Sequence, residues 1–209
     1  MAAFELFSIG HSNSPIGRFI ALLIETGVNA VADVRSTPYS RFLPWFSRNN
    51  LQAHLNAAGI AYLAYGETLG GRPGDASLYC DGVADYEAMA RTAAVQSGLD
   101  RLQNEMAKHR VCLMCAEREP LDCHRCLLVS RALAARGVAI GHVLHDGSVE
   151  PHPVTEQRLM QWAQSSAEPD LFVTGHNERL AAAYRRRGRA AGYKAKPGST
   201  GAKTVAEQR

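Results

Sequence analysis

The sequence predicts an α/β fold with three layers, in which about five mainly parallel strands form a Rossmann-like sheet covered by helices on both faces. Short, unbroken apolar segments alternate with amphipathic segments of helical period, which is typical of parallel strands buried on both sides. Each predicted strand also runs directly into reactive or charged residues. Because the carboxyl ends of parallel strands lie along one edge of a sheet, we expect these residues to form one site.

The first half of the chain contains three predicted strands, at about residues 4–9, 28–34 and 60–65. The helix after the first strand is expected to have Ser14 as its cap and Pro15 at its first position, and Gly27 ends it. A second helix is predicted over residues 47–58. Residues 66–82 are rich in Gly, Asp, Ser and Pro and predict a long loop. Loops of this length in compact domains are more often functional than idle.

The second half begins with a long predicted helix at about 84–108. Two further strands are predicted at about 111–115 and 138–144, joined by a helix that begins near Cys123. Beyond them, helical patterns cover residues 154–166 and 176–187.

These elements predict one α/β domain over 1–150, a helical extension over 151–184 and a disordered basic tail over 185–209. The net charge of +3 is unevenly distributed. The tail holds eight Lys/Arg and one acidic residue, whereas the rest holds fifteen basic and nineteen acidic residues. Any nucleic-acid binding is therefore expected through the tail, from Arg185 to Lys196.

Composition also excludes several classes of protein. No stretch of about 20 apolar residues indicates a membrane span, and the N-terminus lacks the pattern of a secretory signal. Five cysteines are an odd number in a chain of 209 residues, which does not suit a disulfide scaffold. We expect a cytoplasmic protein with no membrane association. The oligomeric state does not follow from the sequence.

The most specific segment runs from Cys115 to Arg125 and reads CAEREPLDCHR. It brings thiols, Glu117, His124 and a guanidinium together where a strand passes into a helix. Free amides at a helix start attract anions and lower the pKa of a nearby thiol such as Cys123, and Arg125 is expected to clamp a phosphate or carboxylate. Taken singly, each cysteine is more simply a small buried residue. The cluster as a whole favours a site.

Four cysteines with the spacing C-x2-C-x7-C-x2-C suggest a zinc site as an alternative. Cys112 and Cys115 are three apart on a predicted strand and therefore point to opposite faces, so a four-cysteine site is not expected. A mixed site that combines Cys115 and Cys123 with His11 or His142 remains open.

Two further strand ends carry candidate site residues. His11 follows the first strand and is a candidate acid or base, while Ser12 is a candidate anion ligand. Asp33 and Arg35 share one face of the second strand, as an ion pair or as ligand-binding residues. Neither a G-x-G-x-x-G fingerprint nor a G-x-x-x-x-G-K-[ST] loop is present, which disfavours a nicotinamide cofactor and an NTP-driven motor.

Several of these motifs, in this order, resemble the bacterial and archaeal domain of unknown function 488 family. The matching pieces are SIGHS, VADVRSTPYSR, GIAY with LGGRP, CAE with CHR, and GHVLHDG, and they extend over about residues 5–147. The resemblance implies a single α/β domain and no particular reaction. The site residues that it implies are His11, Ser12, Asp33, Arg35, Cys115, Glu117, Cys123, His124 and Arg125.

Three functional hypotheses follow. The first is an enzyme, a cysteine-dependent hydrolase or transferase, that acts on an anionic small molecule or nucleotide-like substrate. In it Cys115, Cys123, Glu117 and His11 perform the chemistry, and Ser12, Asp33, Arg35, His124 and Arg125 bind the substrate. The second is a metal-binding protein with Cys, His and carboxylate ligands. The third is a nucleic-acid-associated protein that binds through its basic tail. The sequence identifies no cofactor.

Overall fold

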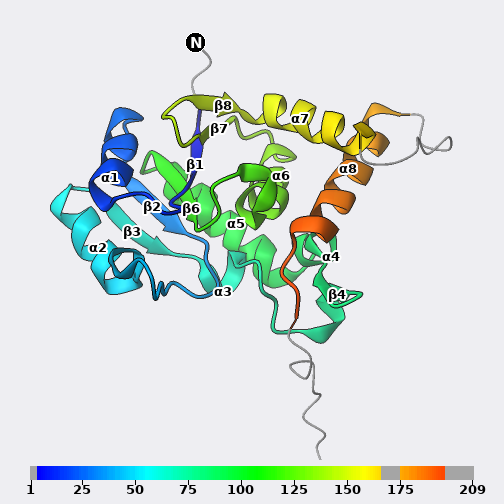
Figure 1. Ribbon diagram of the computed structural model, residues 1–209, viewed down its shortest axis with the longest axis horizontal. Helices are drawn as coiled ribbons and strands as arrows, with labels where there is room; N and C mark the ends of the chain where they lie inside the picture. The colour runs from blue at the N-terminus through cyan, green and yellow to red at the C-terminus, as the bar shows by residue number, and fades with distance from the viewer. Residues whose placement is uncertain (1–3, 166–174, 196–209) are drawn as a thin grey trace, which may run out of the picture.

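A computed structural model of the chain describes residues 4–165 and 175–195. It contains a six-stranded sheet with helices packed on both of its faces (Figure 1). The five predicted parallel strands are confirmed, and they are β1 (Leu6–Gly10), β2 (Ala30–Asp33), β3 (Ala61–Ala64), β6 (Val111–Cys115) and β7 (Ile140–Val143). A sixth strand, β8 (Val149–Pro151), was not predicted and pairs antiparallel with β7 at the edge.

The strand order is β3-β2-β6-β1-β7-β8, so β6 lies between the first two strands of the chain. Gly10 at the end of β1 is in register with Cys115 at the end of β6, and Asp33 at the end of β2 is in register with Met114. The carboxyl ends of these three strands therefore lie side by side. This is the edge at which open α/β sheets bind ligands.

Two apolar cores cover the two faces of the sheet. One face packs against α1 (Ile16–Glu25) and α2 (Arg48–Ala57), and the other against α5 (Ala93–Met106) with the segment after β6. Because side chains alternate along a strand, Cys112 lies in the first core and Cys115 in the second. The two cysteines point to opposite faces, as the sequence predicts.

Several predicted helix boundaries need correction. The predicted helix at 84–108 is divided into α4 (Tyr86–Ala90) and α5, because Thr92 stops the first and caps the second by accepting a hydrogen bond from Val95 N–H. No side chain caps α1, so Ser14 does not have the predicted role.

The connection after β6 also differs from a simple helix. A 3-10 turn, Pro120–Asp122, is followed by a π-helix, Arg125–Ser130, and then by α6 (Arg131–Ala134). The predicted long loop contains α3 (Gly66–Leu69), a 3-10 turn (Ala76–Leu78) and a hairpin of β4 (Tyr79–Cys80) and β5 (Val83–Ala84). Another 3-10 turn, Pro44–Phe46, precedes α2.

The C-terminal extension contains α7 (His152–Ser165) and α8 (His176–Ala191). The predicted disordered tail begins at 185, but α8 continues through that position to Ala191. The helix persists because Tyr184 and Gly188 are buried and because the Arg187 guanidinium lies 4.6 Å from the Trp162 ring. Residues 196–209 lie outside the described residues. No helix in the described part of the chain has the length and hydropathy of a membrane span.

Candidate functional site

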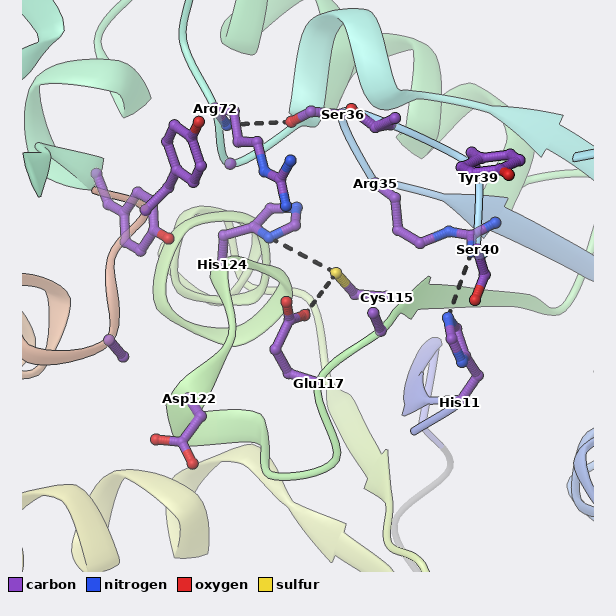
Figure 2. A pocket seen from close by; sticks show the side chains of 16 residues that line it. His11, Arg35, Ser36, Tyr39, Ser40, Arg72, Cys115, Glu117, Asp122 and His124 are labelled. Carbon is purple, nitrogen blue, oxygen red and sulfur yellow. Dashed lines mark hydrogen bonds between the residues drawn. The ribbon is translucent and has the colours of Figure 1, made fainter. Parts of the chain in front are cut away.

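A pocket of about 340 Å³ opens at the carboxyl ends of β1, β2 and β6 (Figure 2). Cys115 and Glu117 reach it from the end of β6, and His124 reaches it from the start of the π-helix that follows the 3-10 turn. The remaining lining residues come from the loops after β1, β2 and β3, from α4, from the segment after β6, and from the end of α8 with the residues that follow it. They are His11, Arg35, Ser36, Thr37, Tyr39, Ser40, Gly71, Arg72, Tyr86, Ala116, Asp122, Ala191 and Tyr193.

Glu117 connects two thiols at the base of this pocket. Its Oε2 atom lies 2.8 Å from Cys115 Sγ and 3.0 Å from Cys123 Sγ. Both cysteines are almost fully buried, but only Cys115 lines the pocket, while Cys123 lies behind it. The two thiols and the carboxylate are therefore close enough to exchange protons without moving.

His124 completes this group, and its orientation is fixed from behind. Its Nε2 atom lies 2.9 Å from the carbonyl oxygen of Val34, which can only accept, so Nε2 carries a proton. Nδ1 then points toward the sulfur atoms, 3.7 Å from Cys115 Sγ and 3.9 Å from Cys123 Sγ. Figure 2 shows the imidazole and the Glu117 carboxylate on the same side of the Cys115 sulfur. Thiol, imidazole and carboxylate form one compact cluster.

The protonation states of the two cysteines diverge. Burial raises the pKa of Cys115, and the neighbouring Cys123 and Glu117 raise it further. Burial alone would also raise the pKa of Cys123, but its hydrogen bond with Cys115 and the Arg125 and His124 charges lower it well below its ordinary value. The Arg125 backbone N–H also donates to Cys123 Sγ at 3.4 Å. Of the two sulfur atoms, Cys123 Sγ therefore gives up its proton more readily than Cys115 Sγ.

The pKa values of the other two members of the cluster, His124 and Glu117, are both raised. Burial alone would lower the pKa of His124, but its interactions with Cys123 and its hydrogen bond with the Val34 carbonyl raise it. Burial raises the pKa of Glu117, and the charge on Cys123 adds to this effect. A histidine and a carboxyl whose pKa values are raised, beside a cysteine whose pKa is lowered, form a group suited to proton transfer.

His11 and Arg35 also reach the pocket, but their polar atoms have internal partners. Arg35 Nε and Nη2 donate to the two carboxylate oxygens of Asp33 at 2.9 and 2.6 Å, and Nη1 donates to His11 Nε2 at 3.3 Å. His11 Nδ1 in turn donates to the Ser12 carbonyl at 2.9 Å. Burial and the charge of Arg35 lower the pKa of His11 to about 4. At neutral pH His11 is uncharged and holds Arg35 in place.

Two predicted ligand-binding residues lie elsewhere. The Arg125 side chain is fully buried, and its Nη1 and Nη2 atoms donate to the carbonyls of Glu117 and Arg118 at 2.6 and 3.0 Å. It therefore braces the loop after β6 and does not reach the pocket as a clamp. Ser12 does not line the pocket and has a left-handed φ of 46°.

Sequence reasoning missed several lining residues, above all Arg72 and Tyr193. Arg72 directly follows Gly70 and Gly71, and the close backbone approach that two glycines permit was the available signal. Tyr193 follows Arg125, the last residue of the predicted site, by 68 residues, and no local pattern indicates its return to the pocket. The two residues contact each other, with 4.7 Å between the Arg72 guanidinium and the Tyr193 ring centroid.

Two groups of side chains have the composition of metal ligands. The first consists of Cys115, Glu117, Cys123 and His124, whose ligand atoms all lie within 4.8 Å of one another. His11 and His142, which the sequence left open as ligands, do not belong to it. The second consists of Cys126, His142 and His152, all of them buried.

The second group is connected by hydrogen bonds that start at a carboxylate. Tyr184 O–H donates to Glu156 at 2.9 Å, so the tyrosine oxygen accepts from His152 Nε2–H at 3.2 Å. His152 Nδ1 then accepts from His142 Nε2–H at 2.9 Å, and His142 Nδ1 accepts from Ser8 O–H at 2.7 Å. The lone pairs that a metal ion would need are therefore occupied. This chain of bonds joins the extension to the sheet.

The basic residues of α8 are largely engaged within the molecule. Arg185 forms an ion pair with Glu87, and Arg187 forms a short one with Asp122 and donates to the Leu121 carbonyl. The nucleic-acid contact expected between Arg185 and Lys196 stays a prediction, since Lys196 lies outside the described residues.

The fold and the pocket define an α/β protein with a parallel-sheet edge that carries a cysteine, histidine and carboxylate cluster. The chain belongs to the family described as Domain of unknown function DUF488, whose model matches residues 15–132. That match includes the CAE and CHR motifs but ends before α7 and α8, and it begins after His11. No curated protein and no solved structure matches the chain at a significant level.

Proposed function

We propose that this protein is a cysteine-dependent enzyme of the hydrolase or transferase class, acting on an anionic small molecule in the 340 Å³ pocket. One observation carries the proposal. Cys115 Sγ lies at the pocket wall, 2.8 Å from a carboxylate whose pKa is raised and 3.7 Å from the Nδ1 atom of a backbone-anchored imidazole. A nucleophile, a base and an oriented acid in contact are the arrangement that covalent catalysis requires.

Cys115 is the nucleophile in this mechanism, because Cys123 does not line the pocket. Glu117 contacts both sulfurs, so it can take the proton of the Cys115 thiol and pass a proton to the Cys123 thiolate. The negative charge thereby moves to the sulfur that faces the substrate. Cys123 acts as the reservoir of that charge, and the buried Arg125 stabilises it.

The covalent step follows from this charge transfer. The Cys115 thiolate attacks the electrophilic carbon or phosphorus, forming a bond to sulfur while the bond to the leaving group breaks. The His124 imidazolium gives its Nδ1 proton to the leaving group. Water or a second substrate then displaces the sulfur, with the neutral His124 as base. Arg35 and Arg72, the two arginines of the pocket lining, attract the anionic part of the substrate.

Thiol alkylation tests the proposal. Iodoacetamide at pH 7 is expected to modify Cys115 faster than it modifies glutathione, with the site read by peptide mass spectrometry. Glu117→Gln removes the base and should slow this labelling by about tenfold. Asp122→Asn is the matched control, because this carboxylate also lines the pocket but no hydrogen bond joins it to either sulfur in the described residues. Labelling of Cys115 no faster than of glutathione would contradict the mechanism.

A metal centre is a second candidate for the same cluster. The observation that favours it is the anchored His124, because a backbone carbonyl on one imidazole nitrogen is a common way to orient the other toward a metal. Two thiolates, an imidazole and a carboxylate suit zinc. Stoichiometric zinc that is lost in Cys123→Ser and retained in Cys80→Ser would favour this candidate. Metal-free, folded protein with a fast-reacting Cys115 would favour the thiol enzyme.

A further inference from the structure

The last turn of α8 and the segment after it form one wall of the pocket, although they lie far outside the family match. Ala191 and Tyr193 line the pocket, whereas the match ends at residue 132. In Figure 1 the segment that follows α8 runs beside α4 and toward β4. This chain therefore completes its pocket with residues that the matched family region does not contain.

Backbone hydrogen bonds fix this wall. Ala84 N–H donates to the Tyr193 carbonyl at 2.9 Å, and Ala195 N–H donates to the Gly82 carbonyl at 2.8 Å. The segment thus lies along β5. Gly192 permits the close approach to β5, since a Cβ atom there would come within 2.8 Å of Val83 Cγ1 and 3.3 Å of the Ala84 carbonyl oxygen. Tyr193 has a defined place in the pocket for these reasons.

Arg72 is the residue that Tyr193 contacts in the pocket. Its side chain is exposed and lines the pocket. Its backbone N–H donates to Ser36 Oγ at 3.1 Å, which holds the loop, and its guanidinium packs 4.7 Å from the Tyr193 ring centroid. Within residues 4–165 and 175–195, no carboxylate pairs with this guanidinium. An aromatic ring orients a guanidinium by its face and leaves the N–H edge available.

The other arginines near the cluster are differently placed. Two nitrogens of Arg35 bind the Asp33 carboxylate, and Arg125 is buried against two carbonyls. Arg72 is consequently the lining cation whose donors remain available for a ligand. Charge-assisted, bidentate hydrogen bonds from such a group are the usual means of recognising phosphate and carboxylate.

We propose that Arg72 is the main anion-binding residue of the pocket and that Tyr193 is a positioning residue that holds it, so that the C-terminal extension determines which oxyanions bind. The inference rests on the proposed function for the pocket as the ligand site. It assigns the anion to phosphate or carboxylate chemistry and places it beside Cys115.

Calorimetric titration of the full-length protein with inorganic phosphate, and separately with citrate, tests this assignment. Arg72→Ala should weaken binding of the preferred anion by at least about tenfold. Arg72→Lys should weaken it by less, because a lysine keeps the positive charge but lacks the paired N–H donors of the guanidinium. Tyr193→Ala should weaken binding by about threefold to tenfold, while Tyr193→Phe keeps the ring and should bind like the wild type. Arg91→Ala, at an exposed arginine outside the pocket lining, is the matched control.

The outcomes separate the anion site from the proposed chemistry. Wild-type affinity in Arg72→Ala, or no binding of either anion by the wild type, overturns the assignment of Arg72. Equal loss in Tyr193→Ala and Tyr193→Phe overturns the positioning role, and melting curves identify a Tyr193→Ala protein that has lost its fold. Iodoacetamide labelling of Cys115 in the same proteins tests the mechanism independently. Arg72-dependent binding without fast labelling supports the anion site and contradicts the thiol mechanism.

Discussion

Gly71 lies directly against the imidazole of His124, and a Cβ atom at position 71 would come within 2.6 Å of the His124 Cγ atom. The imidazole cannot simply move away, because its Nε2 atom is bound to the Val34 carbonyl. The loop after β3 therefore helps to hold the ring over the two sulfur atoms. A glycine of the LGGRP segment thus has a part in the site.

Gly71→Ala should displace His124 and destabilise the fold by about 1–3 kcal/mol, the usual cost of overpacking a tight site. The measurement is the free energy of unfolding in urea, together with the rate of Cys115 alkylation, which should fall. Gly74→Ala is the matched control, because a Cβ atom there has no neighbour within 4 Å. Equal stability and labelling in the two variants would contradict this role.

Arg125→Lys should be strongly destabilising even though it keeps a positive charge. A lysine cannot donate to the Glu117 and Arg118 carbonyls at once, so it leaves buried acceptors unpaired at a cost of about 2–4 kcal/mol. The pKa of Cys123 should also rise, which ultraviolet absorbance of the thiolate would detect. Arg136→Lys changes an arginine whose side chain is only partly buried and should cost little. A small, equal effect of both changes would count against the bracing role.

Stability should fall in acid because of His11. Its pKa is about 4 in the folded chain against an ordinary value of 6.5, so the unfolded state binds a proton at higher pH than the folded state does. The contribution of His11 to the free energy of unfolding is complete above pH 6.5. It is lost as the pH falls toward 4, by at most about 3 kcal/mol. His11→Asn should flatten the pH dependence of unfolding in this window. The exposed His54 provides the control, and His54→Asn should leave the curve unchanged.

Tyr184→Phe should loosen the C-terminal extension. It removes the hydroxyl that joins His152 to Glu156, at a cost of about 1–2 kcal/mol for a buried hydrogen-bonded group. Amide exchange within α8 should become faster, as measured by mass spectrometry. Tyr39→Phe removes the hydroxyl of a largely exposed tyrosine and should leave this exchange unaffected. Unchanged exchange in Tyr184→Phe would show that the extension docks without this bond.

Much of the fold was predictable from the sequence because the strands are continuous apolar segments. Residues such as Val111 and Leu113 leave little alternative to a buried strand. The short edge strand β8 carries no such signal. The division of the helix at 84–108 was also hidden, because Thr92 does not interrupt the apolar pattern. Helix ends depend on backbone hydrogen bonds that a hydrophobic period does not report.

The candidate site was predictable only where its members are close in sequence. Cys115, Glu117, Cys123 and His124 lie within ten residues, and the chain direction brings them together. The role of Arg125 was misjudged, because position near a helix start does not reveal whether a side chain points outward or into the core. Arg72 and Tyr193 meet through long-range packing, which sequence spacing does not encode.

The position of β1 in the sheet has a consequence for folding during synthesis. Its two neighbours in the sheet, β6 and β7, are made more than a hundred residues later. On the ribosome, the first strand therefore emerges long before either partner exists, and the sheet can close around it only after β7 has been made. Such late pairing of distant segments slows folding and leaves strand edges unpaired until it occurs. We therefore expect chaperones to bind the nascent chain.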